Sequence, residues 1–447
     1  MILTPPFSMS KLFRVITLGC KVNQYESAYL DESLTLLGWK RAVGGEKTDI
    51  SIINTCIVTQ AASHQSRQAI RKAIRENPRG IVVATGCYAQ VFPDELSGID
   101  GICIIAGNME KGNLPKLILD MAEPGKIKLV SRAFKPGEPF DFLPIKRFAD
   151  RTRAFLKIQD GCQSFCSYCI VPLARGFYRS LSAAKVLSMV ESLVKEGYKE
   201  IVLTGIHLGK YGADLEKGVN LNQLLVSIGK EGLPVRIRLS SLEISEIDSE
   251  LIEMMASESW LCRHFHVPLQ SGDDGIIKKM KRNYTAGHFE KLIETIHNKM
   301  PHAAIGVDIM SGFPGEDPVA HQNTCALIND LPVSYLHVFP YSPRPGTAAA
   351  TFDAQVDPKV TKIRAAELRY IGQKKRSAFY QRCLGKEFMV LPERWHLEQE
   401  GIMKGISDNY IPVLFPLNQE SNKPISVYME RVEENVMIGS PIHNSLK

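Results

Sequence analysis

The sequence predicts an α/β protein in three parts: an amino-terminal open parallel α/β sheet domain, a central partial (β/α)6 barrel and a small carboxy-terminal all-β barrel. Short apolar runs alternate with helix-like segments over the first 120 residues. The alternation restarts after a Pro-rich stretch, and β-like runs without helical spacers follow residue 380. We place the domains at residues 10–122, 148–377 and 380–446, with a linker at 123–147.

The amino-terminal part is predicted to form successive βαβ units. Apolar runs occur in FRVITLGC, DISIINTC and GIVVATGC, and a further strand is expected near Gly101–Ala106. Helical patterns cover Asn23–Trp39 and Gln60–Asn77, and a third helix is expected to reach Met121. The following AEPGKIKLVSRAFKPGEPFDFLPIKRF lacks helical periodicity and is predicted to be a linker.

The central part contains six strand candidates separated mostly by segments long enough for helices. The candidates are AFLKIQDGC, EIVLTGIHL, RIRLSSLE, HFHVPLQSG, IGVDIMSGFPG and SYLHVFPYSPRPG. This alternation predicts a parallel barrel that is incomplete. A helix over Asp357–Tyr380 ends the barrel. Four β-like runs follow it (EFMVLPERW, QEGIMKGIS, YIPVLFP and ISVYMERV) and predict the terminal β-barrel.

Composition restricts the class of protein. The 447 residues are 44% hydrophobic and 23% charged, as in ordinary globular chains. No apolar run approaches the roughly 20 residues of a membrane helix, and MILTPPFSMSKLF lacks the zones of a signal peptide. We therefore expect a cytoplasmic protein without a membrane partner. The net charge of +6 permits nucleic-acid binding without requiring it. Ten cysteines are too dilute for a disulfide scaffold, so their spacing carries the information.

Three cysteines stand together in DGCQSFCSYC, directly after a predicted strand. Cys162, Cys166 and Cys169 have C-x3-C-x2-C spacing. Three thiolates on one loop can bind three irons of a [4Fe-4S] cluster and leave the fourth iron open to an exogenous ligand. A zinc knuckle is the alternative, and it is disfavoured because the loop offers no fourth cysteine or nearby histidine.

With Tyr168 before the third cysteine, this motif resembles the signature of the radical S-adenosylmethionine (SAM) superfamily. The resemblance implies that SAM chelates the open iron, with Cys162, Cys166 and Cys169 as the catalytic cluster ligands and Tyr168 beside the cofactor. One electron, supplied by an external donor, then cleaves SAM to methionine and a deoxyadenosyl radical that abstracts an unactivated hydrogen.

Polar residues at other strand ends fit the same cofactor. A parallel barrel places its site at the carboxyl ends of its strands. The candidates there are Thr204, Gly205, Ser240, Glu243 and Gln270. Ordinary loop polarity is the alternative for each of them. His264 and His266 alternate within a strand and are interpreted as packing or hydrogen-bonding residues rather than ligands.

A second set of cysteines is dispersed in the sequence. Cys20, Cys56 and Cys87 each end a predicted parallel strand, in TLGC, INTC and ATGC. In an open α/β sheet all three would emerge at one edge, where they could hold a second iron-sulfur cluster. The alternative is that they are buried small hydrophobic residues.

The words GCKVNQYES, NTCIVT and GCYAQ resemble the amino-terminal domain of the methylthiotransferases, which are radical SAM enzymes with two [4Fe-4S] clusters. The resemblance implies a terminal β-domain of the TRAM type. It also implies that the second cluster binds or relays the sulfur, whose source the sequence does not give. The remaining cysteines are interpreted as structural thiols: Cys103, Cys262, Cys325 and Cys383.

Short sequence motifs indicate the branch of this family. CKVNQYES and TGIHLGKYG resemble the branch that adds a methylthio group to carbon 2 of threonylcarbamoyladenosine, next to the tRNA anticodon. The implied partner is the anticodon stem-loop. Sister branches act on isopentenyladenosine, with a C-Q-M-N word, or on a ribosomal-protein aspartate, with C-P-K-N. A non-catalytic iron-sulfur RNA-binding or electron-transfer protein is the alternative from another class.

One loop departs from the family pattern. After the third cysteine the family has a run close to R-G-R-E-R-S-R, whereas this chain has RGFYRSL, with Phe177 and Tyr178 at two of the differing positions. Neither can form the bidentate contact of an arginine with phosphate or carboxylate. We expect contacts with substrate or cofactor to differ here, with the aromatic rings available to stack on a flipped base.

Charge gives limited information on RNA binding. From Arg376 to Lys447 there are eight Lys or Arg and nine Asp or Glu, so the terminal module is not basic. Its aromatic residues could stack on bases or pack in the core: Phe388, Trp395, Tyr410 and Phe415. Three basic clusters elsewhere fit an RNA partner and are equally explained as solvated faces: Arg67, Arg71, Lys72 and Arg75; Lys278, Lys279, Lys281 and Arg282; and Lys374–Arg376.

Overall fold

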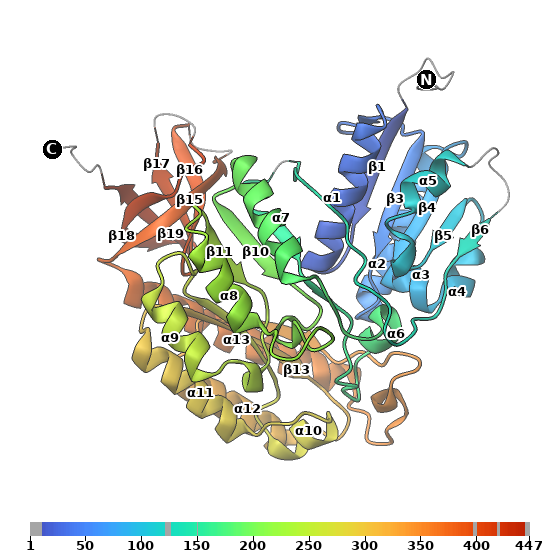
Figure 1. Ribbon diagram of the computed structural model, residues 1–447. Helices are drawn as coiled ribbons and strands as arrows, with labels where there is room; N and C mark the ends of the chain where they lie inside the picture. The colour runs from blue at the N-terminus through green and yellow to red at the C-terminus, as the bar shows by residue number, and fades with distance from the viewer. Residues whose placement is uncertain (1–10, 121–126, 150, 397–399, 418–420, 443–447) are drawn as a thin grey trace.

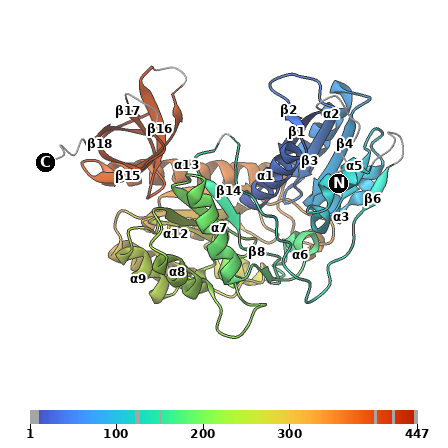
Figure 2. The ribbon, with the colours of Figure 1, turned by 45° about the horizontal axis from the view of Figure 1, so that its top comes forward.

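A computed structural model describes residues 11–120, 127–149, 151–396, 400–417 and 421–442 (Figure 1). The predicted three-part α/β architecture is confirmed: a parallel sheet, a central set of six parallel strands and a closed terminal β-barrel. In Figures 1 and 2 the first and last parts lie on either side of the central part. The predicted domain limits at residues 10, 122 and 446 lie outside the described residues, as does the start of the chain.

The amino-terminal sheet has the order β2-β1-β3-β4-β5-β6 and is parallel throughout. Its strands are β1 (Leu12–Thr17), β2 (Lys40–Arg41), β3 (Ile50–Thr55), β4 (Ile81–Gly86), β5 (Ile104–Ala106) and β6 (Lys128–Val130). The helices are α1 (Lys21–Leu36), α2 (Gln60–Glu76), α3 (Cys87–Val91), α4 (Pro93–Ser97) and α5 (Leu114–Leu119), with a 3-10 turn at η1 (Asn108–Glu110).

Two boundaries in this part differ from the prediction. Helix α1 ends at Leu36 rather than Trp39, because Gly38 adopts a left-handed conformation that stops the helix. The segment predicted as a linker contributes β6, which pairs with β5. A strand of three residues, with Lys128 and Leu129 exposed, is too short to leave a period-2 pattern in the sequence.

The six predicted barrel strands are present and form two parallel sheets of three, β7-β10-β11 and β12-β13-β14. Between β11 and β12 the described residues contain a single isolated bridge, Ile237 to Leu261. The strands are β7 (Ala154–Lys157), β10 (Glu200–Thr204), β11 (Arg236–Leu239), β12 (His264–Gln270), β13 (Ala304–Ser311) and β14 (Tyr335–Pro340).

Helices cover the outside of this partial barrel, where their apolar faces pack into one large core. They are α7 (Ala183–Lys195), α8 (Leu221–Lys230), α9 (Ser249–Ser257), α10 (Asp274–Lys279), α11 (Ala286–Lys299) and α12 (Pro318–Asp330). Short elements follow the strands: β8 (Gln159–Asp160), α6 (Val171–Arg175), β9 (Arg179–Ser180), η2 (Leu208–Lys210), η3 (Ile244–Glu246) and η4 (Ala348–Thr351). No helix of the described chain has the length and apolarity needed to span a membrane.

Helix α13 (Pro358–Cys383) leads into a closed barrel of order β15-β16-β17-β19-β18. The strands are β15 (Glu387–Trp395), β16 (Ile402–Ser407), β17 (Pro412–Pro416), β18 (Ile425–Glu433) and β19 (Val436–Pro441). The prediction missed β19. Strands β18 and β19 are joined by a two-residue turn in which Glu434 and Asn435 both have positive φ, and glutamate there is not a usual turn signal.

A buried carboxylate fixes the terminal barrel to the central part. Glu200, at the start of β10, is fully buried and pairs with Arg236 at 2.6 Å and Arg238 at 2.7 Å. Both arginines also donate across the junction to backbone carbonyls of the terminal barrel, those of Met389, Ile406, Ser407 and Asp408. Burial opposes ionisation of Glu200, but the neighbouring arginines outweigh it and lower its pKa.

We predict that Glu200→Gln destabilises the protein by roughly 3 to 5 kcal/mol, because it leaves buried guanidinium groups without their counter-charge. Thermal unfolding followed by circular dichroism measures the effect as a lowered Tm. The matched control is Glu191→Gln, which removes an exposed pair with Lys195 on α7 and costs about 0.5 kcal/mol or less. Equal Tm values for the two variants would contradict the assigned role of Glu200.

Candidate functional site

The C-x3-C-x2-C loop lies between β8 and α6, at the carboxyl end of the first barrel strand. Its backbone is held by hydrogen bonds from Cys162 N to Gly176 O (2.9 Å) and from Cys169 N to Cys166 O (3.0 Å). Cys166 is buried, and Cys162 and Cys169 are half-buried. The three thiols are close enough for the charge of each thiolate to act on its neighbours. The loop therefore brings the three predicted ligands together.

Two residues contact these sulfurs that the sequence analysis did not assign to the site. The Arg282 guanidinium donates to Cys166 Sγ (3.5 Å) and to Glu243 Oε1 (3.0 Å). His207 Nδ1 lies 3.5 Å from Cys162 Sγ, and its Nε2 lies 2.6 Å from Glu246 Oε1. Burial disfavours the Cys162 thiolate, but the interactions with His207 and Ser164 together outweigh it and lower the pKa of the thiol.

The signals for these two residues were present in the sequence but ambiguous. His207 is part of the TGIHLGKYG word, whose order shows no proximity to Cys162. The neighbouring lysines Lys278 and Lys279 predict that Arg282 belongs to a basic surface cluster, and the structure contradicts that prediction, since its side chain is only 7% exposed. A charge read from sequence alone does not distinguish a surface arginine from one that faces a buried sulfur.

The other predicted cofactor contacts lie at strand ends around this loop. Ser240 Oγ is buried and has no hydrogen-bond partner among the described residues, so it is available to a bound ligand. A side chain at Gly205 would come within 2.9 Å of Gln159, so the backbone there approaches its neighbour closely. Thr204 is buried at the end of β10, and Gln270 follows a bulge in β12 with φ of 65°. These features fit a polar cofactor.

Two predicted contacts are already engaged in the protein. Glu243 pairs with Arg282, so its carboxylate orients that arginine toward Cys166. The Tyr168 ring packs edge-on against Phe313, with 6.4 Å between the ring centroids. Both residues lie at the site, and both contribute to its rigidity.

The second cysteine set also converges. Cys20, Cys56 and Cys87 follow β1, β3 and β4, which are neighbours in the parallel sheet, so the three thiols meet at one edge. Two glycines with positive φ make this approach possible. A Cβ at Gly19 would lie 2.9 Å from Cys56 Sγ, and one at Gly86 would lie 2.5 Å from the Thr55 carbonyl oxygen.

The thiols of this set are unequally exposed. Cys20 is exposed, whereas Cys56 and Cys87 are buried. Burial, followed by the charge of Cys87, raises the pKa of Cys56 to about 12. Asn108 Nδ2 lies 3.7 Å from Cys87 Sγ. Three thiols with an exposed member fit a cluster that is reached from solvent on one side.

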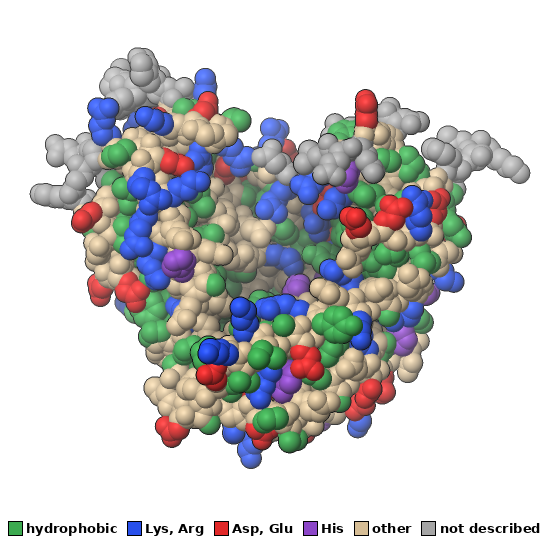
Figure 3. Space-filling model, turned by 180° about the vertical axis from the view of Figure 1, so that it is seen from behind, with side chains coloured by type: hydrophobic (Ala, Val, Ile, Leu, Met, Phe, Trp, Pro, Cys, Tyr) green, Lys and Arg blue, Asp and Glu red, His purple; other side chains and the backbone are tan. Residues whose placement is uncertain are grey.

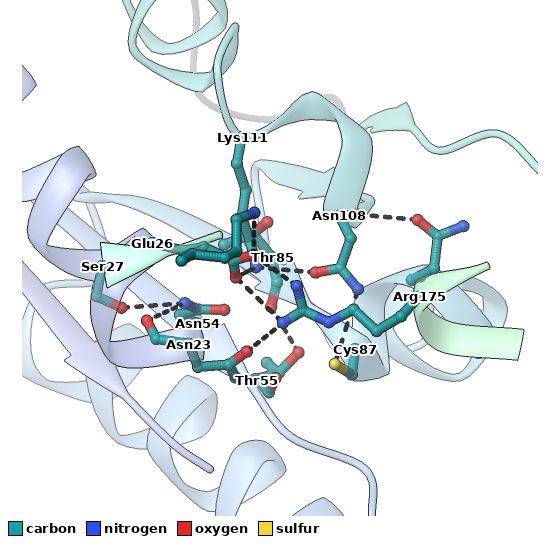
Figure 4. A network of polar contacts seen from close by, with 12 residues as sticks. Asn23, Glu26, Ser27, Asn54, Thr55, Thr85, Cys87, Asn108, Lys111 and Arg175 are labelled. Carbon is teal, nitrogen blue, oxygen red and sulfur yellow. Dashed lines mark hydrogen bonds and ion pairs between the residues drawn. The ribbon is translucent and has the colours of Figure 1, made fainter. Parts of the chain in front are cut away.

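A buried ionic network connects the scaffolds of the two cysteine sets (Figure 4). Glu26, on α1 after Cys20, accepts hydrogen bonds from Arg175 Nη1 at 2.5 Å and from Lys157 Nζ at 3.2 Å. Lys111 pairs with the other oxygen of the same carboxylate. Arg175 also donates to Asn23 Oδ1 at 2.5 Å. Because Arg175 ends α6, directly after the cysteine loop, it ties that loop to α1.

The arginines that remain in the RGFYRSL loop are thus structural. Arg175 is buried against Glu26, and Arg179 lies against Asp160 (3.8 Å) and donates to the Arg175 carbonyl oxygen. Of the two aromatic departures from the family pattern, Tyr178 stands edge-on to His207, with 5.7 Å between the ring centroids. Phe177 is half-buried and contributes to a shallow cavity beside the cysteine loop.

The remaining predicted surfaces divide between packing and solvent. Arg71 and Arg75 are exposed on α2, whereas Arg67 donates to Tyr88 Oη. In the terminal barrel, Phe415 is fully buried in the core and Trp395 is 38% exposed. The four cysteines interpreted as structural thiols are all buried: Cys103, Cys262, Cys325 and Cys383.

A hollow separates the amino-terminal domain from the terminal barrel (Figure 3). One cavity there, of about 490 Å³, is lined by the face of α1 that carries Gln24 and Ala28, by Arg151 and Arg153 before β7, and by Glu393 of β15. Lysine, arginine and histidine side chains are visible around and within the hollow. It is therefore a basic recess formed by all three parts of the chain.

The second half-barrel carries a group of paired polar side chains on its three strands. Asp308 Oδ1 on β13 lies 2.7 Å from His266 Nε2 on β12 and 3.3 Å from His337 Nδ1 on β14. His264 bonds with Tyr335 Oη at 2.7 Å and stacks on Tyr410 of the terminal barrel, with 4.3 Å between the ring centroids. The interpretation of His264 and His266 as hydrogen-bonding residues agrees with these contacts.

Comparisons with known proteins agree with the motifs and the fold. A model described as "Uncharacterized protein family UPF0004" matches residues 12–107, and the model of the radical SAM superfamily matches residues 156–328. The solved structure of the radical SAM methyltransferase TsrM from Kitasatospora setae has a TM-score of 0.57 and 17% identity, over 76% of this chain and 77% of that one. That similarity shows a shared fold.

Curated relatives are closer in sequence. The threonylcarbamoyladenosine tRNA methylthiotransferase MtaB of Aquifex aeolicus is 39% identical over 89% of this chain and 95% of its own. That of Bacillus subtilis is 39% identical over 89% of each chain. The tRNA-2-methylthio-N(6)-dimethylallyladenosine synthase of Natranaerobius thermophilus is 34% identical over 81% of each. The chain therefore belongs to the methylthiotransferase family of radical SAM enzymes.

Proposed function

We propose that this protein adds a methylthio group to carbon 2 of threonylcarbamoyladenosine next to the tRNA anticodon. The observation that carries the proposal is the convergence of two separate cysteine triads joined by a buried network, in a chain whose three parts also form a basic recess. The relatives named for this activity are 34% to 39% identical over most of the chain and support the choice of substrate.

In this proposal Cys162, Cys166 and Cys169 would hold a [4Fe-4S] cluster, with SAM bound beside it. When bound, this pair of cofactors supplies reductive cleavage of SAM, and with it the removal of an unactivated hydrogen. Arg282 neutralises charge at Cys166, and His207 does the same at Cys162. Ser240 Oγ, which lacks a partner among the described residues, offers a hydrogen bond to the cofactor.

Cys20, Cys56 and Cys87 would hold the second [4Fe-4S] cluster, which would supply the sulfur chemistry of the reaction. The network around Glu26 keeps this triad in register with the first one. The recess receives the anticodon stem-loop, and the reaction takes place in the cytoplasm with an external electron donor. The donor of sulfur is not specified by these residues.

We predict that Cys166→Ala stops formation of 5′-deoxyadenosine from SAM while leaving the fold intact, because the radical-forming cluster loses one of its ligands. Chromatography of anaerobic reactions measures the nucleoside, and circular dichroism checks the fold. Cys103→Ala, at a buried cysteine outside both triads, is the control and retains full cleavage. Continued SAM cleavage by Cys166→Ala would refute the assignment of this loop.

The second triad predicts a different phenotype. Cys87→Ala should keep forming 5′-deoxyadenosine but yield no methylthio product, because it removes a ligand of the cluster that handles sulfur. Iron content should fall by up to half relative to the wild type. A variant that still methylthiolates tRNA at the normal rate would show that Cys87 is an ordinary buried thiol.

The substrate is tested by mass spectrometry of tRNA nucleosides from a host without its own enzyme, with and without this gene. We expect a methylthio mass increase on threonylcarbamoyladenosine. An increase on isopentenyladenosine, or on the ribosomal-protein aspartate, would move the protein to a sister branch. Assembled clusters without SAM cleavage would instead indicate an electron-transfer or RNA-binding protein.

A further inference from the structure

Lys21 is a cation of the amino-terminal domain that has no partner among the residues that the structure describes. It is the first residue of α1 and directly follows Cys20. The side chain is half-buried and makes no hydrogen bond or ion pair with the residues that the structure describes. A half-buried ammonium without a partner has lost part of its hydration and gains no ion pair in return. Such a group is unusual unless a ligand supplies an anion.

The position of Lys21 directs it toward the recess. Gln24 and Ala28 lie three and seven residues further along α1, hence on the same helical face, and both line the cavity. The charged groups whose fields act on Lys21 are Arg238, Arg153 and Asp308, besides the Cys20 thiol. Lys21 therefore lies near charged side chains of β11 and β13 and beside a proposed ligand of the second cluster.

The neighbouring arginines differ from Lys21 because each of them already pairs with a carboxylate. Arg238 pairs with Glu200 and donates to carbonyl oxygens of Ser407 and Asp408. Arg153 pairs with Glu393 at 2.7 Å. Asp308 is likewise engaged, because its Oδ1 lies within hydrogen-bond reach of two histidines. Among these groups Lys21 is the cation left for an incoming anion.

The electrostatic potential at this place is positive. Burial, followed by the charges of Arg238, His266 and Lys21, holds the pKa of His264 well below its usual value. The positive field disfavours a metal cation at the compact group of His266, Asp308 and His337, although their spacing would suit one. An anion is favoured instead.

We propose that Lys21 binds the carboxylate of the threonylcarbamoyl substituent and thereby selects the modified adenosine. This proposal rests on the function proposed above and names Lys21 as the residue that recognises the modified base of that substrate. The substituent carries a carboxylate for Lys21, and hydroxyl and urea N–H donors for the polar wall around Asp308. An isopentenyl group has none of these groups, so it would leave the Lys21 ammonium partly desolvated and without an anion.

Binding to short RNAs tests this inference with a readout other than activity. The protein is the reconstituted holoenzyme, kept anaerobic and without reductant so that no turnover occurs. The probes are fluorescent anticodon stem-loops of one sequence that carry adenosine, threonylcarbamoyladenosine or the methyl ester of its carboxylate. Anisotropy titrations give a Kd for each RNA with the wild type, with Lys21→Gln and with Lys195→Gln, an exposed control on α7.

We expect the wild type and Lys195→Gln to bind the threonylcarbamoyl RNA roughly tenfold more tightly than the ester and unmodified RNAs, the size of one charge-assisted hydrogen bond. Lys21→Gln should lose that difference and keep its affinity for the unmodified RNA. An equal loss for all three RNAs would identify a phosphate contact and overturn the proposal. So would an unchanged preference in Lys21→Gln.

The proposed function can fail separately from this inference. A wild type that prefers the threonylcarbamoyl RNA, and whose preference survives in Lys21→Gln, disproves the role of Lys21 and leaves the substrate standing. A wild type with no preference, together with no methylthio product in the nucleoside analysis, removes the substrate itself.

Discussion

The arrangement of this protein depends on one buried carboxylate, Glu26. It lies on the helix that follows Cys20 and is compensated by Arg175, Lys111 and Lys157, which come from three other segments. Burial would raise its pKa, but the three cations outweigh that effect and hold it well below its usual value. An ionised group at this depth is tolerated only when its partners are all in place. The network therefore specifies one relative position of the two cysteine triads.

The same principle is used at the other end of the barrel. Glu200 gathers Arg236 and Arg238, whose remaining donors reach the terminal barrel. Ionic contacts of this kind are directional, whereas apolar contacts allow domains to slide. Both accessory domains are thus oriented on the central barrel by charged side chains that begin or follow its strands. These two junctions therefore determine the shape of the recess between the accessory domains.

The sequence predicted the architecture because its signals are local. Alternating strands and helices, and cysteines at strand ends, are visible without knowledge of distant contacts. It did not predict that Arg175 and Arg282 are buried, because the carboxylates that pair with them, Glu26 and Glu243, are distant in sequence. Lys21 belongs to the word CKVNQYES that indicated the branch, but only the fold shows that it faces Arg238 and Asp308.

The sheet of the central part is interrupted between β11 and β12, and the terminal barrel contacts both sides of this interruption. Among the described residues a single isolated bridge joins the two half-sheets. Few backbone hydrogen bonds therefore oppose their separation. Tyr410 of the terminal barrel lies against Arg238 of one half-sheet and against His264 of the other, and thus connects the two half-sheets. A domain that contacts neither cysteine triad among the contacts described thus holds together the two half-sheets of the catalytic barrel.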